Sequence, residues 1–367
     1  MSKNLLEESV YFIEKLRLFL FVFRHLRLLR QDISDYSFDG LTELHLGQAK
    51  VSSDEISDIL RKKPQLRLLK HYQLTTALCH LHGKDWRTSP GILPTYKLKN
   101  IDADFSHVVR CRMSPHAVLP PDALKLAVAL CPEATSIRLR FDCSTPHHVV
   151  GPLVNLKALR ELSAVCVTSG ERTLLDFTDM IPILEQHGPK TLNMLELKVL
   201  EEVDPHVIGH VCTQLESLTL SGCGYVTPPT CQQFRCRKKS ARLQQLKYLF
   251  YADGDDFSWD HSLPQCFWRS TMSSDKRFKS SLECVCLESP RMTVDTLKES
   301  FDDPASFPRL KILTVCRAPE IDFETIESLS RVAPNLSYLR LTSCEKINAR
   351  FGARIKKLYP DIELKID

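Results

Sequence analysis

The chain has 367 residues, 43% of them hydrophobic and 26% charged, a composition typical of a soluble, well-packed globular protein. Lysine and arginine number 49 against 45 aspartates and glutamates, and a net charge of +4 favours neither nucleic acid nor an anionic membrane as the main partner. A single core usually stops growing at about 250–300 residues, so the length indicates either two domains or a core extended by repeats.

The cysteine content and the start of the chain bear on the compartment. The 14 cysteines are too few for a disulfide scaffold, and no cationic start with a small-residue cleavage site marks a secretory signal. The most apolar stretch, Leu16 to Leu29, is interrupted by Arg17, Arg24 and Arg27, so no transmembrane segment is predicted. We expect reduced thiols and a cytoplasmic or nuclear location, or both.

Residues 1–40 precede the repeats described next. The segment from Leu5 to Leu29 carries apolar residues on nearly all of its own sides. Such a segment is typical of the hydrophobic cap that the open end of a repeat array needs. The alternative is an amphipathic segment that contacts a partner or a membrane surface.

From Leu41 onward the hexad L-x-x-L-x-L recurs. Clear copies begin at Leu41, Leu192, Leu215, Leu282, Leu310 and Leu336, and looser copies at Leu66, Leu93, Ala134, Leu159 and Leu246. Most start positions lie 23 to 36 residues apart, near the period of leucine-rich repeats. The wider gap between Leu93 and Ala134 predicts a degenerate copy around Val108.

Each repeat is predicted to hold one strand and one helix. The end of the hexad alternates with period two, as in a half-buried strand, and the segment that follows has helical spacing. Capping residues stand before several of these helices, with Ser52 and Glu55 forming a capping box, and Asp204, Thr293 and Asp322 in similar places. Prolines that cannot continue a helix precede the next strand at Pro64, Pro132, Pro308, Pro334 and Pro360.

A cysteine after the strand makes a family resemblance specific. Leu215 to Cys223 and Leu336 to Cys344 read L-x-x-L-x-L-x-x-C, although Ala318 replaces the cysteine in another good repeat. This pattern resembles the cysteine-containing repeats of the ribonuclease-inhibitor-like superfamily, whose largest intracellular group is the F-box and leucine-rich-repeat proteins.

The resemblance implies a role for residues 1–40 as well. In that group an F-box of about 40–50 residues docks on the adaptor of a cullin-based ubiquitin ligase. Leu6 to Val10 is similar to the opening L-P-x-E-V of an F-box but lacks its proline, and no tryptophan follows. Residues 1–40 are therefore an N-terminal cap or a degenerate F-box-like segment, and residues 41–367 are the solenoid.

Signatures of catalysis and of cofactor binding are missing from the sequence. The 12 glycines form no phosphate-binding motif, and no G-x-S-x-G elbow is present. His206 and His210 are four residues apart but lack the glutamate that would activate a zinc-bound water, and no C-x-x-C pair exists. We expect no catalytic, cofactor-binding or metal-binding residues, and cysteines that pack in the core.

Two insertions, near residues 224–245 and 252–281, interrupt the repeat pattern. The first carries a basic run from Arg235 to Arg242, which is either a solvated loop or an element for nuclear import or phosphate contact. The second is rich in aromatic residues between Phe257 and Trp268, which either pack on the solenoid or contact a partner.

The predicted fold class is α/β, a leucine-rich-repeat solenoid (horseshoe) of about 11–12 strand–helix repeats with parallel strands on the concave face. Hexad leucines point into the core, so the residues between them face outward as a protein-binding surface. These residues are Arg138, Arg140, Glu196, Lys198, Thr219, Tyr248, Phe250, Thr314, Tyr338 and Arg340.

The functional prediction follows from that surface and from the family resemblance. We expect a protein-recognition module, the substrate-recognition component of a cullin-RING (SCF-type) ubiquitin ligase, with the adaptor bound through residues 1–40. The alternative is a non-enzymatic scaffold or inhibitor with the same surface and no ligase link. An enzyme would need a cluster of titratable groups that the sequence does not show.

Overall fold

The computed structural model describes residues 41–47, 50–89, 91, 93–106, 122–167, 174–226, 243–253, 280–288, 307–318, 321–347, 349–358 and 360–366. The predicted segment 1–40, the basic run, the aromatic run and the cap at Thr293 lie outside these residues. The described chain divides into a first unit, Met1–Leu162, and a second unit, Ser163–Asp367. Within it, no helix is long and apolar enough to cross a membrane.

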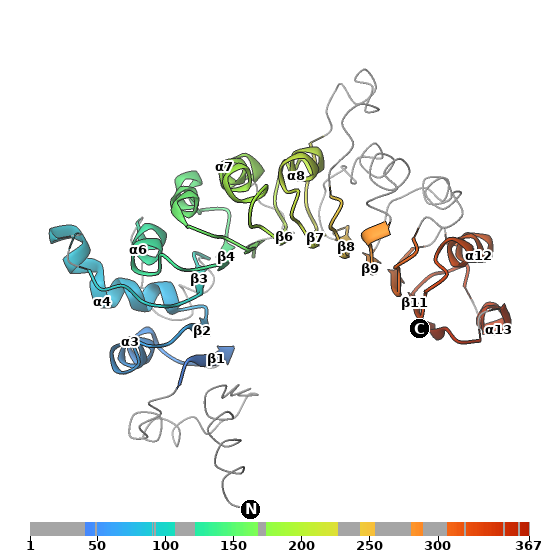
Figure 1. Cartoon of the computed structure of the whole chain (residues 1–367), viewed down its shortest axis with the longest axis horizontal. Coiled ribbons are helices and arrows are strands. Elements are labelled where there is room, and N and C mark those ends of the chain that lie inside the picture. Colours follow the sequence, from blue (N-terminus) through green and yellow to red (C-terminus); the bar gives the residue numbers. More distant parts are fainter. Residues whose placement is uncertain are drawn as a thin grey trace, which may run out of the picture. The chain divides into compact units, whose positions relative to one another are not determined.

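Twelve strands of the described residues form two sheets (Figure 1). Strands β1 and β2 make a two-stranded sheet, and β3 to β12 follow one another in sequence order in a ten-stranded sheet. The registers show parallel pairing throughout. Parallel neighbours in sequence order are what repeated strand–helix units produce, because each helix returns the chain to the start of the next strand.

The first unit carries its helices between short strands. Its elements are β1 (Glu43–Gly47), α3 (Ser53–Lys62), β2 (Leu68–His71), α4 (Leu74–Thr88), β3 (Asn100–Asp104), α6 (Ala123–Leu130), β4 (Ser136–Phe141) and the start of β5 (Glu161–Cys166). Helix α3 begins with the predicted capping box. The Ser52 hydroxyl accepts a hydrogen bond from Glu55 N, and the Glu55 carboxylate accepts one from Ser52 N. Between β4 and β5 two 3-10 helices, η2 (His147–Val149) and η3 (Gly151–Asn155), replace the expected α-helix. Pro146 and Pro152 limit the helical hydrogen bonding there.

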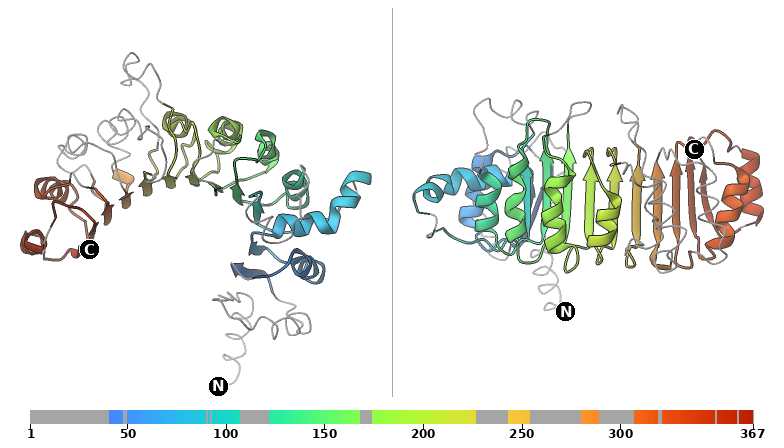
Figure 2. Two further views of the ribbon diagram at one scale, coloured as in Figure 1. Left: turned by 180° about the vertical axis from the view of Figure 1, so that it is seen from behind. Right: turned by 90° about the horizontal axis from the view of Figure 1, so that it is seen from above.

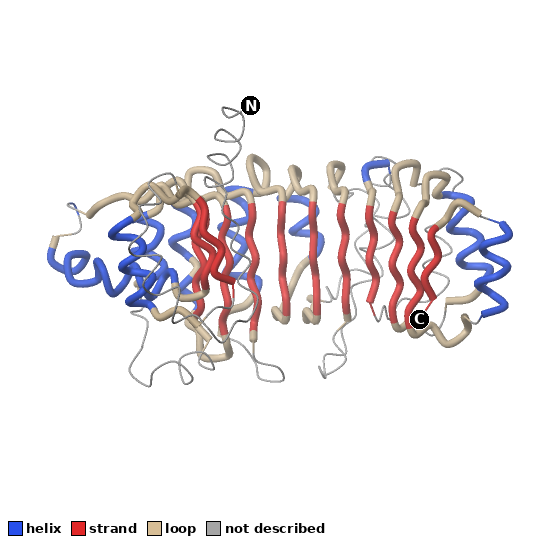
Figure 3. Tube along the Cα trace, turned by 90° about the horizontal axis from the view of Figure 1, so that it is seen from below, coloured by secondary structure: helices blue, strands red, loops and turns tan. Residues whose placement is uncertain are grey.

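The second unit repeats the same plan. Its elements after β5 are α7 (Phe177–His187), β6 (Met194–Lys198), α8 (Pro205–Val211), β7 (Ser217–Ser221), β8 (Tyr248–Ala252), β9 (Cys284–Glu288), β10 (Ile312–Cys316), α12 (Phe323–Val332), β11 (Tyr338–Thr342), α13 (Ala349–Leu358) and β12 (Glu363–Ile366). Within this unit the helices cover one face of the strands, as two views agree (Figures 1 and 2). In each unit, the face of the strands that points away from that unit's own helices is called the open face below, and Figure 3 shows it for the second unit.

The core lies between the strands and the helices and is built from the hexads. In β6, β7 and β11 buried and half-buried residues alternate, and the buried ones are hexad leucines such as Leu195, Leu218 and Leu339. The first residue of each hexad, for example Leu192 or Leu215, is also buried. The predicted period-two burial of the strands is confirmed.

A left-handed residue turns the chain after the strand in four repeats. Val199, Gly222, Arg317 and Ser343 each stand seven residues after the start of a hexad and have φ between +52° and +58°. The N–H groups of Val199, Gly222 and Arg317 each donate a 2.8 Å hydrogen bond to the carbonyl of the last residue of the next strand. This bond extends the backbone ladder by one residue. Only glycine adopts this conformation without steric cost, so the fold imposes it on three other side chains.

The repeat cysteine directly follows this turn. Cys223 donates its thiol to the carbonyl of Leu197, with 3.4 Å between Sγ and O, and Cys344 donates to Val315 at 3.8 Å. Both acceptors belong to the preceding repeat. Ala318, which replaces the cysteine, is equally buried but lacks a donor, so the thiol links neighbouring repeats by more than apolar packing.

Two details of the predicted repeat register are wrong. The hexad assigned to Leu93 begins at Leu98, whose partners Ile101 and Ala103 are the buried apolar residues of β3. Strand β3 pairs directly with β4, Asn100 opposite Ser136, so no further strand stands between them. Val108 itself lies outside the described residues. The predicted strand starts after Pro64, Pro132, Pro308, Pro334 and Pro360 are confirmed, as is the fold class, an α/β leucine-rich-repeat solenoid of parallel strands.

Candidate functional site

The open face of the second unit presents ordered rows of side chains. The registers place Tyr248, Cys284, Ile312 and Tyr338 opposite one another on β8, β9, β10 and β11. A second row, two residues further along each strand, holds Phe250, Cys286, Thr314 and Arg340. Adjacent strands lie about 4.8 Å apart, so each row brings its side chains into neighbouring positions.

These rows contain an exposed apolar patch, made of Tyr248, Phe250, Cys284, Cys286, Ile312 and Tyr338. Tyr248 is 49% exposed and Ile312 is 39% exposed, and both stand among the few large hydrophobic residues of the described chain that are this open to solvent. The two flank Cys284 in one row. Contiguous apolar side chains that a fold leaves in water mark a surface that another molecule covers.

Charged pairs border the patch. Arg317 Nη2 lies 2.8 Å from Glu288 Oε1 at the carboxyl ends of β9 and β10. Further along the sheet, beyond β7, Lys198 Nζ on β6 lies 2.6 Å from Glu196 Oε1, and Ser163 Oγ donates to Glu196 Oε2 at 2.6 Å. A polar rim around an apolar centre is the usual arrangement of a protein interface.

Burial raises the pKa of the Cys284 and Cys286 thiols on the open face. Burial, followed by the charges of Cys316, Cys284 and Glu288, raises the pKa of Cys286 to about 12. A raised pKa removes the nucleophilic thiolate, so Cys286 behaves as an apolar side chain and not as a reactive one. The prediction of core cysteines holds for Cys223 and Cys344 but not for Cys284, Cys286 and Cys316, which lie half-buried on the open face.

The first unit differs because its sheet is interrupted between β2 and β3. One backbone hydrogen bond, from Lys99 N to Arg67 O at 2.6 Å, connects the starts of the two strands, and side chains make the bonds beyond it. Asn100 accepts from Leu69 N at 3.0 Å and donates to Leu69 O at 2.8 Å, and Thr75 Oγ1 donates to Asp102 O at 2.8 Å. The predicted array of strands is therefore not continuous, because two side-chain amide bonds replace a strand pair.

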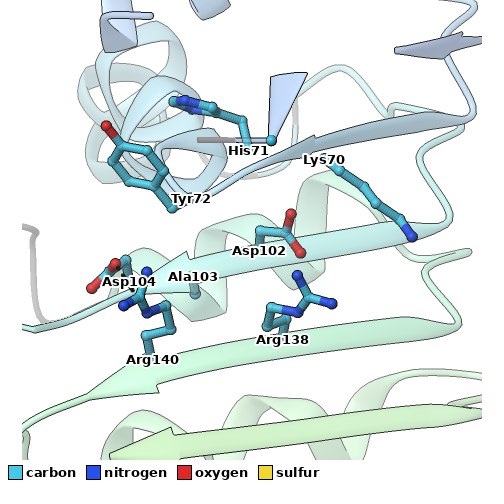
Figure 4. A pocket seen from close by; sticks show the side chains of 9 residues that line it. Lys70, His71, Tyr72, Asp102, Ala103, Asp104, Arg138 and Arg140 are labelled. Atoms are coloured by element: carbon cyan, nitrogen blue, oxygen red, sulfur yellow. Dashed lines mark ion pairs between the residues drawn. The ribbon is translucent and has the colours of Figure 1, made fainter. Parts of the chain in front are cut away.

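A pocket of about 180 Å³ lies beside this interruption on the open face (Figure 4). Nine residues from β1 to β4 line it: Gly47, Lys70, His71, Tyr72, Asp102, Ala103, Asp104, Arg138 and Arg140. The register sets Asp102 opposite Arg138 and Asp104 opposite Arg140. The figure shows the Arg138 guanidinium turned toward Asp102, and Arg140 beside Asp104.

Burial shapes the electrostatics of the pocket. It raises the pKa of Asp102 to about 6, against the opposing effects of Arg138, Lys70 and hydrogen bonds from Asn100 and the His71 backbone. Burial also raises the pKa of Tyr72, and the negative charge of Asp104 adds to the increase. The pocket thus holds one carboxyl group with a raised pKa of about 6 beside one that is almost wholly buried.

All ten residues predicted for the concave face occupy open-face strand positions, none of them buried. Arg138 and Arg140 line the pocket of the first unit, and Tyr248, Phe250 and Tyr338 join the apolar patch of the second. Sequence reasoning missed Ile312 and the half-buried cysteines of the open face, although Ile312 stands between the leucines of a clear hexad. It also missed Asp102 and Asp104, because the hexad was placed at Leu93 instead of Leu98.

Metal binding gains no support at the positions considered from the sequence. Within the described residues, neither the pair His206 and His210 nor the pair Cys284 and Cys286 belongs to a group of three side chains that could share an ion. A zinc site needs four ligands, or three and a water.

Comparisons with known proteins bear on the fold. No protein-family model and no curated protein sequence matches the chain. Among solved structures it is similar to a chain in the crystal structure of the Rad7 and Elc1 complex in yeast, with 17% identity over 99% of this chain and 93% of that one, and a TM-score of 0.53. The leucine-rich repeat-containing protein LegL7 from Legionella pneumophila gives 13% identity, 88% and 92% coverage, and a TM-score of 0.36. The chain has a leucine-rich-repeat fold.

Proposed function

We propose that the chain is a non-enzymatic protein-recognition module that binds a protein partner on the open face of its sheet. The observation that carries the proposal is the exposed row of Tyr248, Cys284, Ile312 and Tyr338 with its charged border. Tyrosine and arginine dominate binding hot spots, and rigid strands present them without further ordering cost. The similarity to a chain solved within a two-protein complex agrees with a role in protein binding.

The more specific proposal is substrate recognition for a cullin-RING (SCF-type) ubiquitin ligase. It is supported by the resemblance of the cysteine-containing repeats to those of F-box and leucine-rich-repeat proteins, and it assigns adaptor binding to residues 1–40. A scaffold or inhibitor without a ligase link is the alternative, which the missing F-box proline and tryptophan favour.

Affinity purification of the full chain from cells, followed by identification of the bound proteins, separates these two roles. Recovery of an adaptor and a cullin supports the ligase, and the double variant Leu6→Asp, Val10→Asp should lose both while retaining the partner of the open face. A partner recovered reproducibly without adaptor or cullin supports the scaffold.

The open-face surface itself is tested by affinity once a partner is identified. Tyr248→Ala and Tyr338→Ala should each weaken binding by about 2 kcal/mol, roughly thirtyfold, because truncation of a central aromatic leaves its pocket on the partner unfilled. Glu324→Ala, on the exposed side of α12, is the control and should leave the dissociation constant unchanged. Loss of binding in the control alone would place the interface on the helices.

A further inference from the structure

One carboxylate oxygen in the pocket of the first unit lacks a hydrogen-bond donor. Asp104 Oδ1 accepts from Ser106 N at 2.9 Å and from Ser106 Oγ at 2.7 Å. Asp104 Oδ2 is buried and accepts no hydrogen bond from the described residues. Its nearest cation, Arg140 Nε, lies 3.8 Å away, which is too far for a hydrogen bond. Only 3% of the Asp104 side chain is exposed, so the missing donor has to come from a group that enters the pocket.

The size of the pocket restricts what the donor belongs to. At about 180 Å³ it is smaller than the roughly 300–1,000 Å³ of sites that enclose small-molecule ligands. One side chain is therefore the better match in size. The pocket lies among open-face side chains of the first unit, and open-face side chains are those to which the proposed function assigns protein binding, so we assign the donor to a side chain of a bound protein.

Charge and shape favour a guanidinium group in this position. Asp102 and Asp104 stand two residues apart on one strand and both line the pocket, so a planar fork of donors is able to reach both carboxylates. The ring of Tyr72 forms part of the wall, where it is able to meet a cation. A bound cation would also offset the burial that now raises the pKa of Asp102.

The lining cations Lys70, Arg138 and Arg140 compete with an incoming guanidinium, but the two arginines are exposed enough for water to screen their charge. The Arg140 side chain is 42% exposed and Arg138 is exposed, and long basic side chains keep their charged ends in water. The guanidinium groups of Arg138 and Arg140 are therefore placed to bind acidic side chains that stand next to a basic residue in the partner. We propose that the pocket between β2 and β3 binds one arginine side chain of the protein partner, with its guanidinium on Asp104 Oδ2 and acidic neighbours on Arg138 and Arg140. This inference rests on the proposed function of the open face.

The pocket is testable without the partner, by ligand-observed NMR titration of the full chain with N-acetylarginine amide. Saturable binding is expected, and N-acetylcitrulline amide, which has the same shape without the charge, should bind at least tenfold more weakly. Asp104→Asn should lower the affinity for the arginine probe by roughly tenfold or more. Arg140→Gln should raise this affinity severalfold, because the substitution removes a competing cation from an exposed position. Glu133→Gln, which removes an exposed negative charge of the same unit, is the control.

Each outcome decides the inference. No saturable arginine binding, equal binding of citrulline, or binding that Arg140→Gln weakens would overturn it, and the last result does not depend on whether Asp104→Asn folds. Inorganic phosphate that binds in place of arginine would identify an anion site instead. If the arginine probe does not bind while Tyr248→Ala still lowers the affinity for the protein partner, only the pocket inference fails. If arginine binds but open-face variants leave the partner unaffected, the proposed function fails.

Discussion

The two units of the chain use the same repeat but treat its open face differently. Between β6 and β11 of the second unit the backbone ladder runs from strand to strand, and the open face holds aromatic and thiol side chains. In the first unit the ladder stops between β2 and β3, Asn100 replaces it, and the open face carries paired aspartates and arginines.

The comparison shows which part of a repeat is constrained. Inward positions are mostly apolar in both units, for example Ile101 and Ile137 in the first and Leu195 and Leu218 in the second, because each strand buries them against its helix. Open-face positions meet no such requirement, so they are free to diverge toward a charged pocket in one unit and an apolar patch in the other.

The largest expected effect tests the shared inward positions. Leu218→Ala on β7 should lower the free energy of unfolding by about 2–5 kcal/mol, because a fully buried side chain leaves a cavity. Thr219→Ala, one residue further and on the open face, should stay within about 0.5 kcal/mol. Chemical denaturation of both variants measures this contrast, and equal losses would contradict the assignment of the two faces.

The second effect tests the interruption in the first unit. Asn100→Ala should cost about 2–4 kcal/mol, because the buried N–H and C=O of Leu69 both lose their partner. The control is Asn335→Ala in the second unit, where an exposed amide donates one bond to Pro308 O and the ladder supports the strands independently. Its cost should stay below about 1 kcal/mol. If denaturation gives Asn100→Ala the same small cost, the interruption does not depend on that amide.

A third effect separates core thiols from the rest of the core by pH. Burial raises the pKa of Cys131 to about 12, so the folded thiol stays protonated while the unfolded one ionises from about pH 9. The contribution of this thiol to the free energy of unfolding is therefore fully present below pH 9. It decreases between pH 9 and 12, by up to about 1.4 kcal/mol per pH unit.

Denaturation curves recorded across this range measure the effect. Cys131→Ala should flatten the alkaline loss, whereas Val128→Ala, an apolar core change in the same region, should shift the curve downward by the same amount at every pH. Parallel curves for Cys131→Ala and the unaltered chain would show that this thiol does not contribute.

The smallest effect concerns the turn after the strand. Val199 has φ +55°, which a β-branched residue adopts only at a cost, so Val199→Gly should be neutral or stabilise the second unit by up to about 1 kcal/mol. Thr219→Gly, within a regular strand, should destabilise it by about 0.5–1 kcal/mol. Thermal unfolding compares the two, and a clear loss for Val199→Gly would mean that its side chain contributes more than the strain costs.

Much of the fold was predictable from local patterns. The hexads placed ten of the twelve described strands correctly, and Pro360 indicated β12, because buried alternation and helix-breaking prolines act within one repeat. The strand at Asn100 was misplaced since Leu98, Ile101 and Ala103 form a weak hexad beside the more obvious Leu93. All ten expected open-face residues could be assigned to that face by alternation alone.

By itself, the sequence determined the repeat, its strand–helix content and which side of each strand is buried, because these depend on side chains a few residues apart. The tertiary structure alone decided that Tyr248, Cys284, Ile312 and Tyr338 form one row, since inter-strand register relates residues about 30 positions apart. It also decided that Asn100 interrupts the sheet and that Asp104 is buried with an open acceptor, because hydrogen-bond partners and burial depend on neighbouring repeats, whose relative positions no local pattern encodes.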